Sequence, residues 1–274
     1  DGPCLRESNY FCIQIRDTVY AGEPAKALVL DKLVHGLVDP DDPARPIYDY
    51  QLLYREQLTA SVTPGEELDA FLIGGGTYTF PRYLERAYRG RVLVSEIDPA
   101  VTDVARQHLG LSERSRIEIV HEDARQVVER FAADERFDLV IGDAFNDAAV
   151  PFHLTTKEFN DLIAAHLSPG GMYMVNLIDG VDYDFLRAYV KTLQLTFPSV
   201  RLLTLEGGWP LDGTPQTLVV VAGDRPPPVV PSAVDPEGLR HLLDSRPAPV
   251  LTDEHVPVDQ LLAGVFERRF RDAA

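Results

Sequence analysis

The chain has 274 residues, enough for one large domain or for one domain with a smaller partner. Its 43 acidic and 26 basic residues give a net charge of −17, which disfavours nucleic-acid binding because phosphate contacts need a basic face. The same charge attracts cations, although it also serves solubility alone. No apolar run reaches the roughly 18 residues of a membrane span, and no signal peptide is visible. Because the first residue is Asp1 rather than Met, we expect a piece of a longer protein.

The chain has few cysteines and histidines that could bind a metal ion or form a disulfide. Cys4 and Cys12 are the only cysteines; they match no zinc pattern, and we expect no disulfide and a reducing compartment, the cytoplasm. Three histidines fall near predicted strand ends, at His35, His121 and His153. None has ligand spacing with another, so we expect no metal site.

Residues 1–60 are predicted to form a small β-rich N-terminal domain with a linking helix. Loose alternation of apolar and polar residues predicts strands over 10–16, 27–30 and 33–34. A proline-rich loop follows, and a helical pattern then covers 48–60. Tyr48, Tyr50 and Tyr54 lie at helical spacing, so we expect them mainly to pack, with one hydroxyl reaching the site.

Residues 61–224 alternate between strand and helix patterns. The predicted strands are 68–73, 91–96, 116–120, 137–141, 172–177, 200–205 and 216–221, and helices separate the first six. Such alternation implies a parallel sheet with right-handed crossovers, and the last two strands imply an antiparallel hairpin at its edge. We therefore predict an α/β, Rossmann-like methyltransferase fold with seven strands. Residues 225–274 read as a proline-rich segment and a C-terminal extension with two short helices.

A glycine turn and an acidic strand end form the clearest motif of the chain. Gly74, Gly75 and Gly76 lie between an apolar strand and a helix start, where backbone can approach a ligand closely. Glu96 follows Gly74 by 22 residues, the spacing of a ribose-binding carboxylate. A tight turn without ligand is the simpler alternative. No lysine of a phosphate-binding loop follows the glycines, which favours a nucleoside such as S-adenosylmethionine over a nucleotide.

Acidic residues also follow the next two strands. Asp123 ends one strand pattern, and Asp143 ends another with Asn146 and Asp147 close behind. Carboxyl ends of parallel strands meet at one crevice, so we expect an acidic site there, although Asp123 could simply cap a helix. Asp143 follows an apolar strand and is our candidate general base, since a carboxylate can take the proton of a bound ammonium. The alternative is an ordinary turn residue.

Seven stretches resemble motifs of the spermidine synthase family of polyamine aminopropyltransferases. They are Glu7-Ser-Asn-Tyr10, Leu30-Asp31 with Val34-His35, Ile73-Gly-Gly-Gly76, Glu96-Ile-Asp98, Asp123, Phe137-Asp-Leu-Val-Ile-Gly-Asp143 and Phe197-Pro-Ser-Val200. Residues 143–159 resemble the bacterial branch that is fused to membrane segments. The resemblance then implies transmembrane segments outside the present sequence and no membrane contact by this part.

The resemblance also implies an activity and a site. The reaction would transfer an aminopropyl group from decarboxylated S-adenosylmethionine, a co-substrate, to a small polyamine, releasing methylthioadenosine without a prosthetic group. Glu96 would bind the ribose, Asp123 the adenine amino group, and Asp143 would be the base. The remaining donor-binding residues would be Gly74, Gly75, Gly76, Thr77, Ile97, Ala124 and His35, and the acceptor-binding residues Tyr10, Asn146, Asp147 and His153. Family resemblance also implies a homodimer formed through the N-terminal part.

The chain departs from the family pattern on the amine side. Thr77 stands where the family has Asp, Phe11 and His35 replace glutamines, and Asn146 replaces a second aspartate. Two other hypotheses therefore stay open. Thr77 would suit a donor that keeps its carboxylate, which indicates an S-adenosylmethionine-dependent N-methyltransferase. Asn146 and Phe11 would suit a non-catalytic domain that senses a nucleoside or polyamine.

Overall fold

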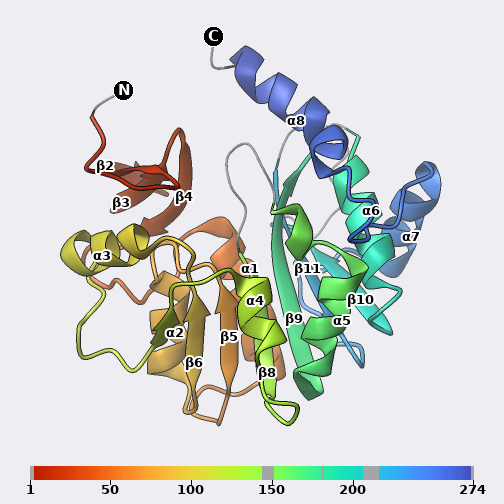
Figure 1. Cartoon of the computed structure of the whole chain (residues 1–274), viewed down its shortest axis with the longest axis horizontal. Helices are drawn as coiled ribbons and strands as arrows, with labels where there is room; N and C mark the ends of the chain where they lie inside the picture. The colour runs from red at the N-terminus through yellow and green to blue at the C-terminus, as the bar shows by residue number, and fades with distance from the viewer. Residues whose placement is uncertain (1–2, 144–150, 181, 206–215, 273–274) are drawn as a thin grey trace.

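A seven-stranded sheet forms the centre of the computed structural model, which describes residues 3–143, 151–180, 182–205 and 216–272 (Figure 1). The sheet order is β10-β11-β9-β8-β5-β6-β7. Strands β5 to β9 run parallel, whereas β11 is antiparallel to both of its neighbours. The bounds are β5 (Ala70–Ile73), β6 (Val92–Ser95), β7 (Glu118–Val120), β8 (Phe137–Gly142), β9 (Leu167–Asp179), β10 (Ser199–Leu203) and β11 (Gln216–Gly223). The predicted fold class and edge hairpin are confirmed.

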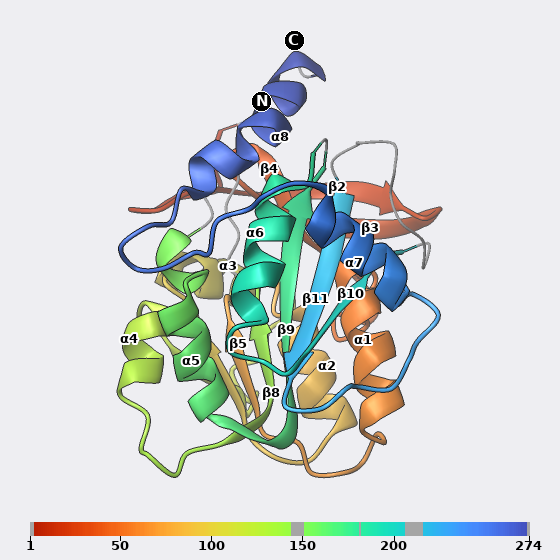
Figure 2. The same ribbon diagram turned by 90° about the vertical axis from the view of Figure 1, so that its right-hand side faces the viewer.

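Helices cover both faces of this sheet because alternate strand residues point to opposite sides. Phe71 and Ile73 pack with α4 (Ala124–Glu129), α5 (Lys157–Ala165) and α6 (Asp184–Leu193), which cross the sheet in Figure 2. Ala70 and Leu72 pack on the other face with α1 (Asp49–Ser61), α2 (Thr79–Ala87) and α3 (Pro99–His108). Both faces are therefore buried, which explains why the strands are continuously apolar.

A four-stranded antiparallel sheet forms the N-terminal part. Its strands are β1 (Arg6–Glu7), β2 (Cys12–Tyr20), β3 (Glu23–Leu30) and β4 (Leu33–Val38). Ile13 and Leu28 belong to the same buried cluster as Tyr50 and Tyr54 of α1, so this sheet shares a core with the rest of the chain. Figures 1 and 2 place it across the upper end of the large sheet.

The C-terminal extension packs against α6. It contains α7 (Pro236–Ser245) and α8 (Val258–Asp272). The buried guanidinium of Arg187 in α6 donates to the carbonyl of Leu242 at 3.0 Å and to the hydroxyl of Ser245 at 3.2 Å. The division at residues 60 and 224 stays a prediction, since both flanking parts share the core of the middle one. Within the parts described, no helix combines the length and apolar character needed to cross a membrane.

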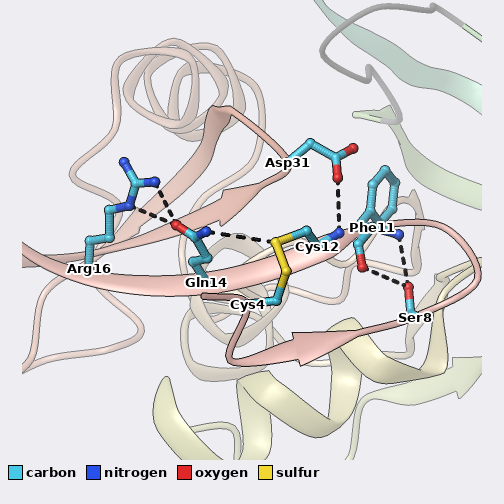
Figure 3. The surroundings of a disulfide bond; sticks show 7 residues. All are labelled: Cys4, Ser8, Phe11, Cys12, Gln14, Arg16 and Asp31. Atoms are coloured by element: carbon cyan, nitrogen blue, oxygen red, sulfur yellow. Dashed lines mark hydrogen bonds between the residues drawn. A yellow bond between two sulfur atoms is a disulfide. The ribbon is translucent and has the colours of Figure 1, made fainter. Parts of the chain in front are cut away.

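The two cysteines form a disulfide, so the expectation that they stay unpaired is wrong (Figure 3). The hydroxyl of Ser8 accepts hydrogen bonds from the N–H groups of Tyr10 and Phe11, which turns β1 back along β2. This turn brings the Cα atoms of Cys4 and Cys12 to 5.3 Å, a normal disulfide separation. Two cysteines eight residues apart gave no sign of this turn. Because disulfides persist in oxidising compartments, the cysteines no longer support a reducing location.

We expect the double variant Cys4→Ser, Cys12→Ser to lose about 2 kcal/mol of unfolding free energy, because the cross-link restricts the unfolded chain. Urea unfolding of the oxidised protein and of the variant measures this difference. Wild-type protein reduced with dithiothreitol should match the variant, and equal stability of all three samples would contradict the prediction.

Candidate active site

The site lies at the carboxyl ends of the parallel strands, where the sheet order reverses between β5 and β8. The strand register pairs Ile73 with Ser95 on one side and with Gly142 on the other. Gly74, Glu96 and Asp143 directly follow Ile73, Ser95 and Gly142, so they lie side by side at the ends of β5, β6 and β8. The N–H of Asp143 donates to the carbonyl of Ile73 at 2.9 Å, which fixes this arrangement.

The glycine turn is held by Glu96. Gly74 and Gly76 have φ angles of +94° and +50°, which favour glycine, and a Cβ on Gly75 would lie 2.4 Å from the ring of Tyr78. The N–H groups of Gly75 and Gly76 donate to one oxygen of Glu96, at 2.8 and 3.4 Å. These amides are therefore engaged by a carboxylate of the protein, in keeping with a nucleoside rather than a phosphate ligand.

Glu96 is itself almost fully buried. Its second oxygen accepts the N–H of Asp98 at 2.9 Å, and burial raises the pKa of the Glu96 carboxyl above its ordinary value. Each carboxylate oxygen has two acceptor positions. The oxygen that accepts the Asp98 N–H can therefore accept one further hydrogen bond, whereas the other oxygen already accepts two, and Glu96 lines the cavity.

Asp123 combines the two roles that the sequence left open. One oxygen caps α4 by accepting the N–H groups of Arg125 and Gln126, at 3.0 and 3.2 Å. The other lies 2.7 Å from Nε2 of His153, in the short 3₁₀ helix Phe152–Leu154. Asp123, Ala124 and His153 all line the cavity. His153, which was expected on the acceptor side, therefore contacts the Asp123 carboxylate and helps to orient it.

Asp143 has an unusual acidity. Burial raises the pKa of its carboxyl to about 7, the nearby Glu96 charge adds to this, and hydrogen bonds from Asn176 and Tyr50 partly oppose it. The amide Nδ2 of Asn176 donates to Asp143 at 2.9 Å. A carboxyl that titrates near neutral pH can exchange a proton with a bound ligand, which is what a general base requires.

The N-terminal part supplies much of the remaining wall. Tyr48, Tyr50 and Tyr54 form a chain of edge-to-face ring contacts, and the hydroxyl of Tyr50 reaches Asp143, so one hydroxyl enters the site as expected. Tyr10 and His35 line the cavity as predicted, and Phe11 joins them.

The cavity has a volume of about 430 Å³ and is lined by acidic side chains. Four carboxylates line it, from Glu96, Glu122, Asp123 and Asp143. Among the lining residues described, none is a lysine or arginine. A cationic ligand is favoured in such a cavity. No group of three His, Cys, Asp or Glu side chains within the described ranges is placed to hold a metal ion.

The structure does not bring every predicted residue to the cavity. Gly75 faces the ring of Tyr78, and the buried side chain of Thr77 donates to Thr79 at 3.0 Å and packs against Gly36. Gly74, Gly76 and Ile97 do line the wall. Asn146 and Asp147 lie outside the described residues.

Other lining residues were missed by sequence analysis. Asn176 is the only amide in the otherwise apolar and aromatic run Met172–Ile178, a signal similar to that of Asp143, and it could have been found this way. Thr217 lies within an unremarkable strand pattern, and Leu262 and Val265 belong to a helix far along the chain. No local pattern pointed to these three.

Fold and site together define a class: a Rossmann-like methyltransferase fold with an acidic cleft at the carboxyl ends of its parallel strands. The spermine/spermidine synthase domain model matches residues 53–194, slightly more than half of the chain. The chain belongs to the spermine/spermidine synthase domain family.

Curated relatives share only part of their length with this chain. A probable polyamine aminopropyl transferase of Bifidobacterium longum is 29% identical over 127 residues, which cover 46% of this chain and 28% of that protein. Polyamine aminopropyltransferase 2 of Pseudomonas aeruginosa is 29% identical over 161 residues, covering 54% and 46%. The matched part is therefore less than half of either relative.

Solved structures share the fold. A probable spermidine synthase from Corynebacterium glutamicum has a TM-score of 0.76 at 20% identity, covering 92% of this chain and 97% of that one. A spermidine synthase in complex with the transition-state analogue AdoDATO has a TM-score of 0.54 at 18% identity, covering 94% and 88%. At these identities the likeness concerns the fold alone.

We expect Asn176→Leu to raise the pKa of Asp143 above 7, because the change removes a hydrogen bond that favours the charged form. A hydrogen bond to a charged group contributes roughly 1.5–3 kcal/mol, so the pKa should rise by about one to two units. NMR titration of aspartate carboxyl carbons measures it. Asp179, a buried carboxyl whose pKa is also about 7, does not line the cavity and should titrate as in wild type. An unchanged Asp143 titration would contradict this account.

Proposed function

We propose that this protein is an aminopropyltransferase that moves an aminopropyl group from decarboxylated S-adenosylmethionine to a small polyamine and releases methylthioadenosine. One observation carries the proposal: Asp143, with a pKa of about 7, stands beside the glycine turn and Glu96 in a carboxylate-lined cavity. Family membership and the curated aminopropyltransferase relatives support the same reading.

The nucleoside side of the donor fits the β5–β6–β7 half of the cavity. Glu96 presents a fixed carboxylate oxygen with one acceptor position left, which suits a ribose hydroxyl. Asp123 suits an exocyclic amino group of the base, because its oxygens are oriented by α4 and His153. Ile97 adds an apolar surface beside them. The positive sulfonium of the donor then lies near Asp143, where the cavity is acidic.

The acceptor arrives as an ammonium ion. With an ordinary pKa of about 10.4, roughly one amine in 2,500 is free at pH 7. The ionised Asp143 carboxylate takes the ammonium proton, and the freed nitrogen lone pair attacks the methylene carbon bonded to sulfur. The new C–N bond forms as the C–S bond breaks, and the bonding electrons return to sulfur, giving a neutral thioether. Asn176 and Tyr50 hold the carboxylate in place for this step.

The two competing functions have different support. The N-methyltransferase hypothesis depended on Thr77, whose side chain packs against Gly36 and does not line the cavity. The sensing-domain hypothesis depended on Phe11, which lines the cavity, and on Asn146 outside the described residues. A pKa of about 7 at Asp143 favours catalysis, since a binding site for a cation is better served by a fully ionised carboxylate.

Finer features of the family stay part of this proposal. They are a homodimer formed through the N-terminal sheet, transmembrane segments elsewhere in the protein, and a cytoplasmic catalytic domain. The Cys4–Cys12 disulfide weighs against the last of these.

The proposed base predicts a pH dependence. Only ionised Asp143 can accept a proton, so kcat/KM for the amine should rise as pH increases through about 7. Steady-state rates between pH 6 and 9, with saturating donor, measure this. A profile that is flat from pH 6 to 8 would exclude Asp143 as the base.

Substitution of the base provides the central test. We expect Asp143→Asn to reduce product formation by roughly 10²- to 10⁴-fold, the usual contribution of a general base. Mass spectrometry of the nucleoside product, with both forms of S-adenosylmethionine and a panel of amines, gives the readout. Asp179→Asn is the matched control, because Asp179 ends the neighbouring strand, has a similar pKa and does not line the cavity.

The products separate the three functions. Methylthioadenosine that is lost in Asp143→Asn, but retained in Asp179→Asn, would support aminopropyl transfer. S-adenosylhomocysteine would instead identify a methyltransferase. Nucleoside binding without any product would indicate the sensing domain.

A further inference from the structure

The C-terminal extension forms part of the cavity wall. Leu262 and Val265 of α8 line the same cavity as Asp143 and are only 2% and 3% exposed. The family model ends at residue 194, so these residues lie beyond the part that it matches. In Figure 1, α8 lies at the upper end of the molecule, above α6.

The segment before α8 is fixed to α6 and α5. The N–H of Leu251 donates to the Thr192 hydroxyl of α6 at 2.9 Å, and its carbonyl accepts the N–H of Lys157, where α5 begins, at 2.8 Å. The N–H of Asp253 then donates to Glu158 of α5 at 3.0 Å. Figure 2 shows this connection between α7 and α8 crossing these helices. These bonds therefore fix the position of the part of the cavity wall that α8 forms.

An ion pair joins this segment to the opposite half of the cavity. Both terminal nitrogens of Arg125 donate to the two carboxylate oxygens of Asp253, one of them at 2.7 Å. Arg125 also donates to the carbonyl of His153 at 3.2 Å. Bidentate pairs of this kind fix direction as well as distance. Asp253 is thus a candidate positioning residue for the wall.

The sheet order places this wall on the acceptor side. The nucleoside residues Gly74, Glu96 and Asp123 follow β5, β6 and β7 on one side of Asp143. Asn176 and Thr217 belong to β9 and β11 on the other side. Helix α8 packs against α6, which follows β9 directly in the chain. The half beyond Asp143 is therefore closed by apolar side chains.

We propose that Leu262 and Val265 determine which acceptor amine fits, by packing against its hydrocarbon chain and limiting its length. The proposal rests on the aminopropyl transfer proposed above. Both side chains are aliphatic, so they favour methylene groups over a charged end of the acceptor. The acceptor is then a linear amine whose length is matched to the space between Asp143 and α8.

The test compares linear diamines with three to six methylene groups. We expect Leu262→Ala and Val265→Ala to move the preference toward longer diamines, with the long-to-short ratio of kcat/KM changing about tenfold per methylene accommodated. Val265→Leu should move it toward shorter ones. Leu242→Ala of α7 is the matched control, because Leu242 is 3% exposed in the same core and does not line the cavity.

Two results would overturn the proposal: a ratio unchanged in both alanine variants, or an equal change in Leu242→Ala. Calorimetric binding of the same diamines, with methylthioadenosine present, gives a readout that does not need turnover. If wild-type protein binds diamines but makes no product, the proposed function fails, and the length preference is still decided by binding. If no diamine binds, the wall has no role in acceptor choice.

The positioning role of Asp253 has its own test. We expect Asp253→Asn to raise the acceptor KM several-fold with little change in kcat or in methylthioadenosine affinity. Asp259→Asn removes one charge from the first turn of α8 without touching Arg125 and should behave as wild type. A change confined to methylthioadenosine affinity would show that the ion pair serves the nucleoside half instead.

Discussion

The carboxylate of Glu96 connects the separate parts of this site. It is buried, and both of its oxygens accept backbone N–H groups, two from the glycine turn and one from Asp98. These bonds shape the turn that lies beside the ligand. The same charge raises the pKa of Asp143, which follows β8 on the other side of β5. One anion therefore shapes the glycine turn and contributes to the raised pKa of the proposed base.

The cavity wall is built in two ways. Gly74 and Glu96 stand at strand ends of the central sheet, where parallel register fixes each position. Segments outside the parallel strands complete the wall: the N-terminal part with Tyr10 and His35, helix α1 with Tyr50, and α8 with Leu262.

Charge also favours this arrangement. A sulfonium and an ammonium repel one another, and placing them in contact needs compensating negative charge. In the proposed reaction Asp143 and Glu96 would supply it from β8 and β6, the two strands that flank β5. The thioether product would be neutral, so part of the attraction that holds the donor would disappear after transfer.

The sequence by itself determined the order of strands and helices along the chain, the glycine turn and the acids after each strand. These are local patterns: period-two and period-3.6 apolar spacing, glycine where φ is positive, and acids at strand ends. It also identified Asp143, because a lone carboxylate after an apolar strand is expected to be partly buried. Asn176 carried the same kind of signal on the next strand.

Only the tertiary structure decided which distant segments complete the cavity. Thr77 turns toward Gly36, and Cys4 meets Cys12, because packing and a turn around Ser8 set their directions. Leu262 reaches the cavity because the bonds of Leu251 and Asp253 carry the chain across α6, α5 and α4. Contacts between residues so far apart in sequence depend on how the whole chain folds, and no local pattern of residues specifies them.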